Sequence, residues 1–337
     1  MRADCVFQPT ERFPSSHGST LVALPGGELL AAWYAGEREK APDVAILCAH
    51  KKPGADRWTQ ARVVADTPGK AEGNPVLFLS DEGEVWLFYQ TMQGSGEGRT
   101  RPGTGWTTCN VKRKRSADGG LNWGDEEIIV AELGFCIRSK PCLLPNGDIV
   151  LPMHDERNWS SIMLISTDDG QTWAFSDRID CGRGFNKGND EPTLLLRRDA
   201  SLLCYMRSGL SEGIWQSVSG DGGWTWSPPE LTGLPNPNSA VELLGLQSGH
   251  ALLAFNNSRR ARTPLTLALS RDEGASWLHC LDVEDQPGEY SYPALVQSGD
   301  GAIHLTYTYR RTHIAHVALT EEELSIAARA CAWGATD

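Results

Sequence analysis

Apolar residues in this chain gather in short runs that are broken by tight polar turns. Five stretches share one form, an apolar run, a turn of Pro, Gly, Asn or Asp, and a second apolar run; they lie at residues 19–35, 75–90, 140–154, 192–208 and 294–310. Apolar runs of this length between turn residues are typical of β-strands and hairpins. Helical periodicity occurs only over residues 321–331. The pattern therefore predicts an all-β protein.

An eight-residue box, Ser-x-Asp-x-Gly-x-x-Trp, follows several of these hairpins. The four copies recur about every fifty residues, at 116–123, 166–173, 219–226 and 270–277. A repeat of this length that carries about four strands is typical of a β-propeller blade. We expect the Gly to supply the positive φ of a tight turn, the Asp to accept hydrogen bonds from turn amides, and the Trp to pack beneath the hairpin. These roles are structural, so the boxes should lie away from any site.

The number of blades follows from the segments that lack a clean box. Residues 50–58, which end in Trp58, resemble a box that has lost its Asp–Gly register and would make a fifth unit. The last hairpin, within residues 291–319, has no box after it. An N-terminal strand near residues 5–8 could complete its sheet. We predict a six-bladed β-propeller that forms a single domain over residues 1–337.

Composition restricts the partners that this fold could bind. A formal net charge of −12 disfavours nucleic acid and anionic membranes. No apolar segment is long enough for a membrane helix, and the first residues lack the apolar core of a secretory signal. The nine cysteines are scattered without a CxxC pair, which predicts reduced core thiols in a cytoplasmic protein. We expect no metal or organic cofactor, because neither a phosphate-binding glycine loop nor a ligand cluster occurs.

Asp boxes on a predicted six-bladed propeller make this chain resemble the sialidase (neuraminidase) superfamily over nearly its whole length. The resemblance implies three arginines that hold a substrate carboxylate, an Asp acid/base, and a Tyr nucleophile activated by a Glu. Guanidinium groups suit a carboxylate because they form paired hydrogen bonds. A neutral Tyr can approach an anomeric carbon that bears a carboxylate, where an ionised carboxylate would be repelled.

Strand ends in this sequence match those roles. Glu191 and Arg207 resemble the family's Glu and second arginine, and Tyr292 resembles the nucleophile, with Tyr290 as a near rival. Asp43 resembles the acid/base. The remaining matches are Arg262 as the third arginine, with Arg259 and Arg260 as competitors, and Arg38 as an auxiliary arginine in the loop of Asp43.

The family's first arginine is missing, and His17 stands in its place. Arg138, at another strand start, could supply the lost charge. The segment His154–Arg157 is interpreted mainly as a polar turn, with a lesser possibility that it reaches the substrate. The presence of His17 in place of an arginine argues against sialic acid as the substrate more than it argues against an acidic sugar in general.

Three functional hypotheses follow from these residues. The first is a retaining exo-glycosidase that acts on a terminal acidic sugar, a sialic acid or a related ulosonic or uronic acid. The second is a lyase on uronate-containing glycans, in which His17 or Tyr292 would move the protons. The third is a non-catalytic carbohydrate-binding propeller.

Overall fold

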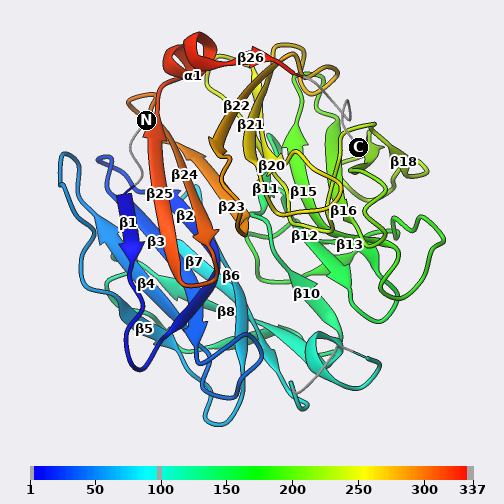
Figure 1. The fold of residues 1–337 in the computed structure, drawn as a ribbon. Coiled ribbons are helices and arrows are strands. Elements are labelled where there is room, and N and C mark those ends of the chain that lie inside the picture. The colour runs from blue at the N-terminus through cyan, green and yellow to red at the C-terminus, as the bar shows by residue number, and fades with distance from the viewer. Residues whose placement is uncertain (1–3, 97–100, 332–337) are drawn as a thin grey trace. The chain divides into compact units, whose positions relative to one another are not determined.

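The computed structural model describes residues 4–96 and 101–331, and these residues are almost entirely β-strand. Six small antiparallel sheets form the blades of a six-bladed β-propeller, as the sequence predicts (Figure 1). The described helices are a 3-10 turn, η1 (Gly105–Thr108), and one α-helix, α1 (Glu321–Ala327). Neither of them combines the length and apolar character that a membrane crossing needs.

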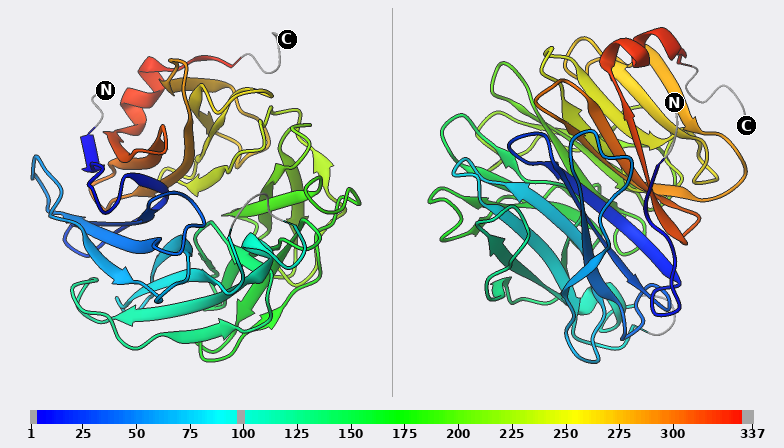
Figure 2. Two further views of the ribbon diagram at one scale, coloured as in Figure 1. Left: turned by 60° about the horizontal axis from the view of Figure 1, so that its bottom comes forward. Right: turned by 90° about the vertical axis from the view of Figure 1, so that its left-hand side faces the viewer.

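The chain divides into two compact units, one made of residues 1–137 with 292–320 and the other of residues 138–291 with 321–337. The single domain therefore stays a prediction. The first unit contains three four-stranded sheets, which Figure 2 shows from two further sides. Their strands are β2 (Ser15–Ala23), β3 (Leu29–Gly36), β4 (Ala45–Lys51) and β5 (Arg62–Ala65); β6 (Glu72–Leu79), β7 (Val85–Met92), β8 (Cys109–Ser116) and β9 (Glu127–Val130); and β23 (Tyr290–Gln297), β24 (Ile303–Tyr309), β25 (His313–Leu319) and β1 (Asp4–Phe7). The short strand β10 (Phe135–Ile137) ends the unit's first segment.

Strand β1 completes the sheet of the last hairpin. It pairs antiparallel with β25, and Asp4 lies opposite His316. The prediction that an N-terminal strand joins the last sheet is therefore confirmed.

The second unit contains the other three sheets. Their strands are β12 (Ile149–Asp155), β13 (Ser160–Ser166) and β14 (Ala174–Phe175), with β11 (Cys142–Leu143) paired to β12; β15 (Asn189–Leu196), β16 (Leu202–Ser208), β17 (Trp215–Ser219) and β18 (Glu230–Leu231); and β19 (Glu242–Gly245), β20 (Ala251–Asn256), β21 (Leu265–Ser270), β22 (His279–Glu284) and β26 (Arg329–Ala330). Core clusters lie between the faces of adjacent sheets, for example between β16 and β20.

The boxes have the structural roles that the sequence predicts. In the last box, the buried Ser270 hydroxyl accepts the Gly274 N–H at 2.8 Å, and Asp272 Oδ1 accepts the Ser276 N–H at 2.8 Å. Gly274 has a φ of 85°, and a Cβ there would lie 2.7 Å from Leu203 Cδ2. The other three boxes repeat both hydrogen bonds. A glycine is required because the turn is both left-handed and tightly packed.

Two features of the C-terminal segment differ from the sequence prediction. The helix ends at Ala327 rather than at residue 331, and β26 then pairs with β22. This pairing places Cys331 beside Cys280, and the two form a disulfide. The prediction of reduced cysteines is wrong for this pair, because a link across 51 residues depends on a strand pairing that no local motif encodes. Cys48 and Cys204 are buried free thiols, as predicted.

Candidate active site

A bulged turn recurs near the start of the first strand in several sheets. Register shifts interrupt β2 after His17, β6 after Gly73 and β15 after Asp190. The residues that follow have left-handed φ angles, 62° at Gly18, 38° at Asn74 and 46° at Glu191. A bulge turns a side chain away from the regular strand direction. A left-handed conformation costs a non-glycine residue about 1–2 kcal/mol, and such strain is often found at functional sites.

The predicted residues Glu191 and Tyr292 share this backbone geometry. Tyr292 has a φ of 54° near the start of β23. Both residues precede a proline, and Asn74 does so as well. Asn74 is buried, and the sequence analysis did not identify it. The signal that could have found it is the repeated residue-Pro pair at the start of a strand.

In the second unit, Glu191 is held by Arg207. Arg207 Nη1 lies 2.8 Å from Glu191 Oε2, and the two side chains are only 11% and 4% exposed. The guanidinium also lies over the Trp159 ring, at 5.7 Å from the ring centroid. Because burial limits competition from water, this ion pair fixes the positions of both groups.

Asn238 connects Arg207 to Arg262. Its side-chain Oδ1 accepts a hydrogen bond from Arg207 Nε at 2.5 Å, and its backbone carbonyl accepts one from Arg262 Nη2 at 3.0 Å. Arg262 Nη1 also donates to Glu289 Oε1 at 2.9 Å. The structure therefore brings the second and third predicted arginines within reach of one residue. The competing residues Arg259 and Arg260 are exposed.

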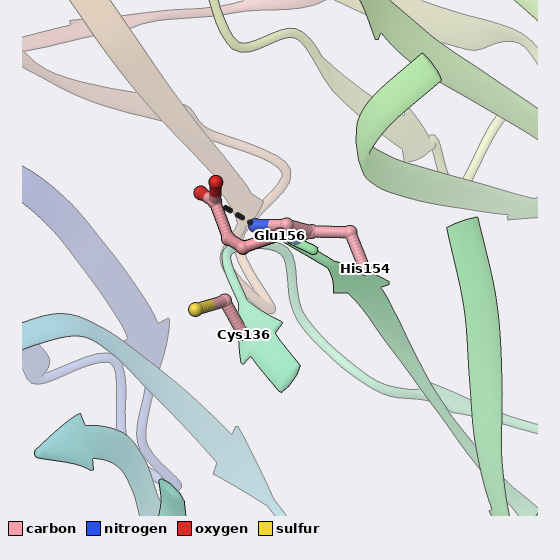
Figure 3. Close-up of side chains that lie close together, drawn as sticks. All are labelled: Cys136, His154 and Glu156. Atoms are coloured by element: carbon pink, nitrogen blue, oxygen red, sulfur yellow. Dashed lines mark ion pairs between the residues drawn. The ribbon is translucent and has the colours of Figure 1, made fainter. Parts of the chain in front are cut away.

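Next to Glu191, a cluster of ionisable side chains is buried. His154 Nε2 lies 3.6 Å from Glu156 Oε1 (Figure 3). The same nitrogen lies 3.1 Å from Asp190 Oδ1. The polar turn predicted over His154–Arg157 begins only at Glu156, because His154 and Asp155 belong to β12 and β15 covers this end of the strand. Burial opposes the charged imidazole, but the nearby carboxylates of Asp190 and Glu156 raise the pKa of His154 to about 9. Burial raises the pKa of Asp190 to about 7.

In the first unit, His17 packs against two tyrosines. Its ring centroid lies 4.2 Å from that of Tyr292 and 5.5 Å from that of Tyr34, which it meets edge-on. A Cβ on Gly18 would lie 2.7 Å from the Tyr34 ring, so glycine is needed for this packing. Tyr290 is completely buried, whereas Tyr292 retains 8% exposure. This difference favours Tyr292 as the residue that a substrate can reach.

Asp43 and Arg38 lie in the exposed loop between β3 and β4. Asp43 Oδ2 accepts the Glu37 N–H at 2.9 Å, and Arg38 forms an ion pair with Glu37 at 3.5 Å. Arg138, by contrast, is almost completely buried just after β10. An exposed carboxylate can exchange protons with solvent, as an acid/base must, but the roles of these three residues stay predictions.

Comparisons with known proteins agree with this architecture. The family model of the BNR repeat-like domain matches residues 27–305. The chain belongs to this family of sialidase-superfamily propellers. It is 27% identical to a sialidase of Micromonospora viridifaciens over 342 residues, which cover 90% of this chain and 51% of the relative. The chain thus spans about half the length of that curated relative.

Solved structures share the BNR repeat-like fold at low sequence identity. An intramolecular trans-sialidase of Ruminococcus gnavus superposes with a TM-score of 0.76 at 18% identity, covering 95% of this chain and 98% of that one. A protein of unknown function from Dyadobacter fermentans gives a TM-score of 0.78 at 18% identity, covering 94% and 98%. A Hadza microbial sialidase gives 0.76 at 17% identity, covering 92% and 66%. At these identities the likeness supports the fold alone.

Proposed function

We propose that this BNR repeat-like protein is a sialidase-like exo-glycosidase that releases a terminal acidic sugar with retention of configuration. The observation that carries the proposal is the linkage of Arg207 and Arg262 through Asn238. Two guanidinium groups held at one residue, in a chain of net charge −12, form a local site for an anion. Membership of the sialidase superfamily makes a sugar carboxylate the natural anion.

Arg207 and Arg262 bind the carboxylate in this proposal. The contacts to Glu191, Glu289 and Asn238 hold both guanidinium groups in place. A planar guanidinium held in this way suits a carboxylate, which it can bind through paired hydrogen bonds. The strained backbone at Glu191 is held by a salt bridge to one of these arginines, so binding and proton transfer share one rigid element.

The bond changes follow from the assigned roles. The Tyr292 oxygen attacks the anomeric carbon while its phenolic proton passes to Glu191. Asp43 protonates the leaving glycosidic oxygen, and the C–O bond to the leaving group breaks. Water then attacks the tyrosyl-sugar intermediate, Asp43 accepts its proton, and Tyr292 recovers its own from Glu191. Two inversions at the anomeric carbon give retention.

Replacing Tyr292 by Phe tests the proposal. Tyr292→Phe should abolish turnover of a fluorogenic sialoside and leave binding of free sialic acid largely intact. Tyr290→Phe is the matched control, because it makes the same change on the same strand at a completely buried side chain, and it should retain activity. Wild-type turnover in folded Tyr292→Phe would overturn the assignment. NMR of the first-formed product should show the same anomer as the substrate.

One observation favours a second candidate, elimination from a uronate. His17 replaces an arginine and packs on Tyr292 at 4.2 Å, an arrangement in which one residue could act as base and the other as acid. The products distinguish the two reactions. Elimination yields an unsaturated sugar that absorbs in the near ultraviolet, and hydrolysis yields a saturated free sugar.

A further inference from the structure

Three buried carboxylates gather beside Arg207, and the proposed reaction uses only one of them. Glu156, Asp190 and Glu191 are 7%, 2% and 3% exposed. Arg207 neutralises one of these charges. Unpaired buried charges are strongly unfavourable, so the cluster needs a further cation or a protonated carboxyl group. His154, 1% exposed and facing both Asp190 and Glu156, can supply a positive charge.

A short path of contacts links His154 to Glu191. His154 Nε2 lies 3.1 Å from Asp190 Oδ1. The same oxygen accepts the backbone N–H of Glu191 at 2.8 Å. Glu191 has the left-handed φ of 46°, which the chain adopts only where neighbouring contacts enforce it. The carboxylate of Asp190 is thus fixed on one side by His154 and fixes the bulged turn on the other.

We propose that His154 is a positioning residue for Glu191, acting through Asp190. As an imidazolium it favours ionisation of Asp190, which burial opposes, and it fixes the oxygen that receives the Glu191 N–H. It also balances the negative charge around Glu191. The step in which Glu191 takes a proton rests on the proposed function, whereas the fixing of the Glu191 turn does not.

The groups that face His154 set the sign of its titration. Asp190, Glu156 and Glu191 favour the imidazolium, while burial opposes it, and the carboxylates prevail. Arg207 pairs with Glu191 and, like His154, lowers the pKa of Asp190. His154 is therefore charged at neutral pH and loses its proton only in the alkaline range. Turnover that depends on the imidazolium should fall as the pH rises through that range.

A variant that keeps the hydrogen bond and removes the charge tests this role. In His154→Gln the side-chain amide can still donate to Asp190. We expect kcat to fall about tenfold to hundredfold, KM to change less than threefold, and the alkaline limb of the kcat profile to disappear. The matched control is His50→Gln, since His50 is another buried histidine, 3.5 Å from Glu28, and its substitution should leave the profile unchanged. A His154→Gln enzyme with wild-type kcat and the same alkaline limb would overturn the proposal.

A second measurement does not depend on activity or on the folding of His154→Gln. NMR of ring nitrogens in the wild-type protein should show that His154 titrates well above 7. The Glu191 amide resonance should shift with the same midpoint, and both effects should be lost in Asp190→Asn. The positioning role is refuted if His154 titrates with the usual histidine pKa of about 6.5. It is also refuted if the Glu191 amide resonance does not shift with the His154 titration. If both NMR effects occur and no acidic glycoside is turned over, the pairing stands and the proposed reaction fails.

Discussion

Replacing Asn238 by glycine would separate the two arginines without disturbing the backbone between them. Asn238 has a φ of 57°, a conformation that glycine adopts readily. The backbone carbonyl that accepts from Arg262 Nη2 is retained in Asn238→Gly. The side-chain oxygen that accepts from Arg207 Nε is lost. The variant therefore tests how much the fixed position of Arg207 contributes to binding.

Both folding and activity should weaken in this variant. Glycine relieves about 1 kcal/mol of left-handed strain and loses a similar amount through the entropy of the unfolded chain, so the lost hydrogen bond to Arg207 dominates and the free energy of unfolding should fall by about 1.5–3 kcal/mol. A hydrogen bond to a charged group contributes about 1.5–3 kcal/mol. Because each 1.4 kcal/mol corresponds to about a factor of ten, kcat/KM should fall about ten- to hundredfold. Most of the change should appear in KM, since Arg207 holds the carboxylate before and during reaction.

The assay measures kcat and KM on a fluorogenic sialoside, together with calorimetric binding of free sialic acid and a urea unfolding curve. Asn186→Gly is the matched control, since Asn186 has a φ of 59° and an exposed side chain. It should leave all three measurements unchanged. If folded Asn238→Gly retains kcat/KM and sialic acid affinity within twofold, Asn238 does not position Arg207 for a carboxylate.

Two further predictions concern stability. Gly274→Ala should lower the free energy of unfolding by about 2–5 kcal/mol, because it adds left-handed strain and places a Cβ 2.7 Å from Leu203. Gly220→Ala is the control and should change the free energy of unfolding little, because the space around Gly220 is open. Equal urea midpoints for the two variants would refute the packing argument. Burial, with repulsion from His304 and Lys51, lowers the pKa of His316 to about 3, below its unfolded value of about 6.5. The contribution of neutral His316 to stability is thus complete above about pH 6.5 and is lost as the pH falls towards 3. The free energies of unfolding of wild type and His316→Gln should therefore converge as the pH falls. A difference that stays constant with pH would contradict this prediction.

Much of the fold could be predicted because its signals are local. Each box fixes its own turn through contacts within eight residues, and each hairpin carries its own turn residues. Glu191 and Tyr292 were chosen by likeness to the family, and the structure gives both a left-handed φ near the start of a strand, while their roles stay predictions. Asp43 and Arg38 were placed by likeness to a family loop, and the structure gives them exposed positions without testing their roles.

The missed features depend on contacts between distant segments. Asn238 belongs to no strand or motif, and its importance arises only where two arginines reach it from other segments. The sequence of His154–Arg157 resembles a polar turn throughout, because it does not reveal that His154 ends β12 and is covered by β15. The Cys280–Cys331 disulfide likewise depends on the pairing of β22 with β26.

The pairing of β1 with β25 has a consequence for synthesis of the chain. Residues 4–7 are made before the other described strands, but their partners at residues 314–316 are made about three hundred residues later. The uninterrupted segment 138–291 of the second unit emerges in between, so it can begin to fold while the first unit still lacks its last hairpin. Until β1 pairs with β25, the unpaired edge of β25 is open to neighbouring nascent chains. Substitutions in residues 4–7 that weaken this pairing should therefore increase aggregation during translation.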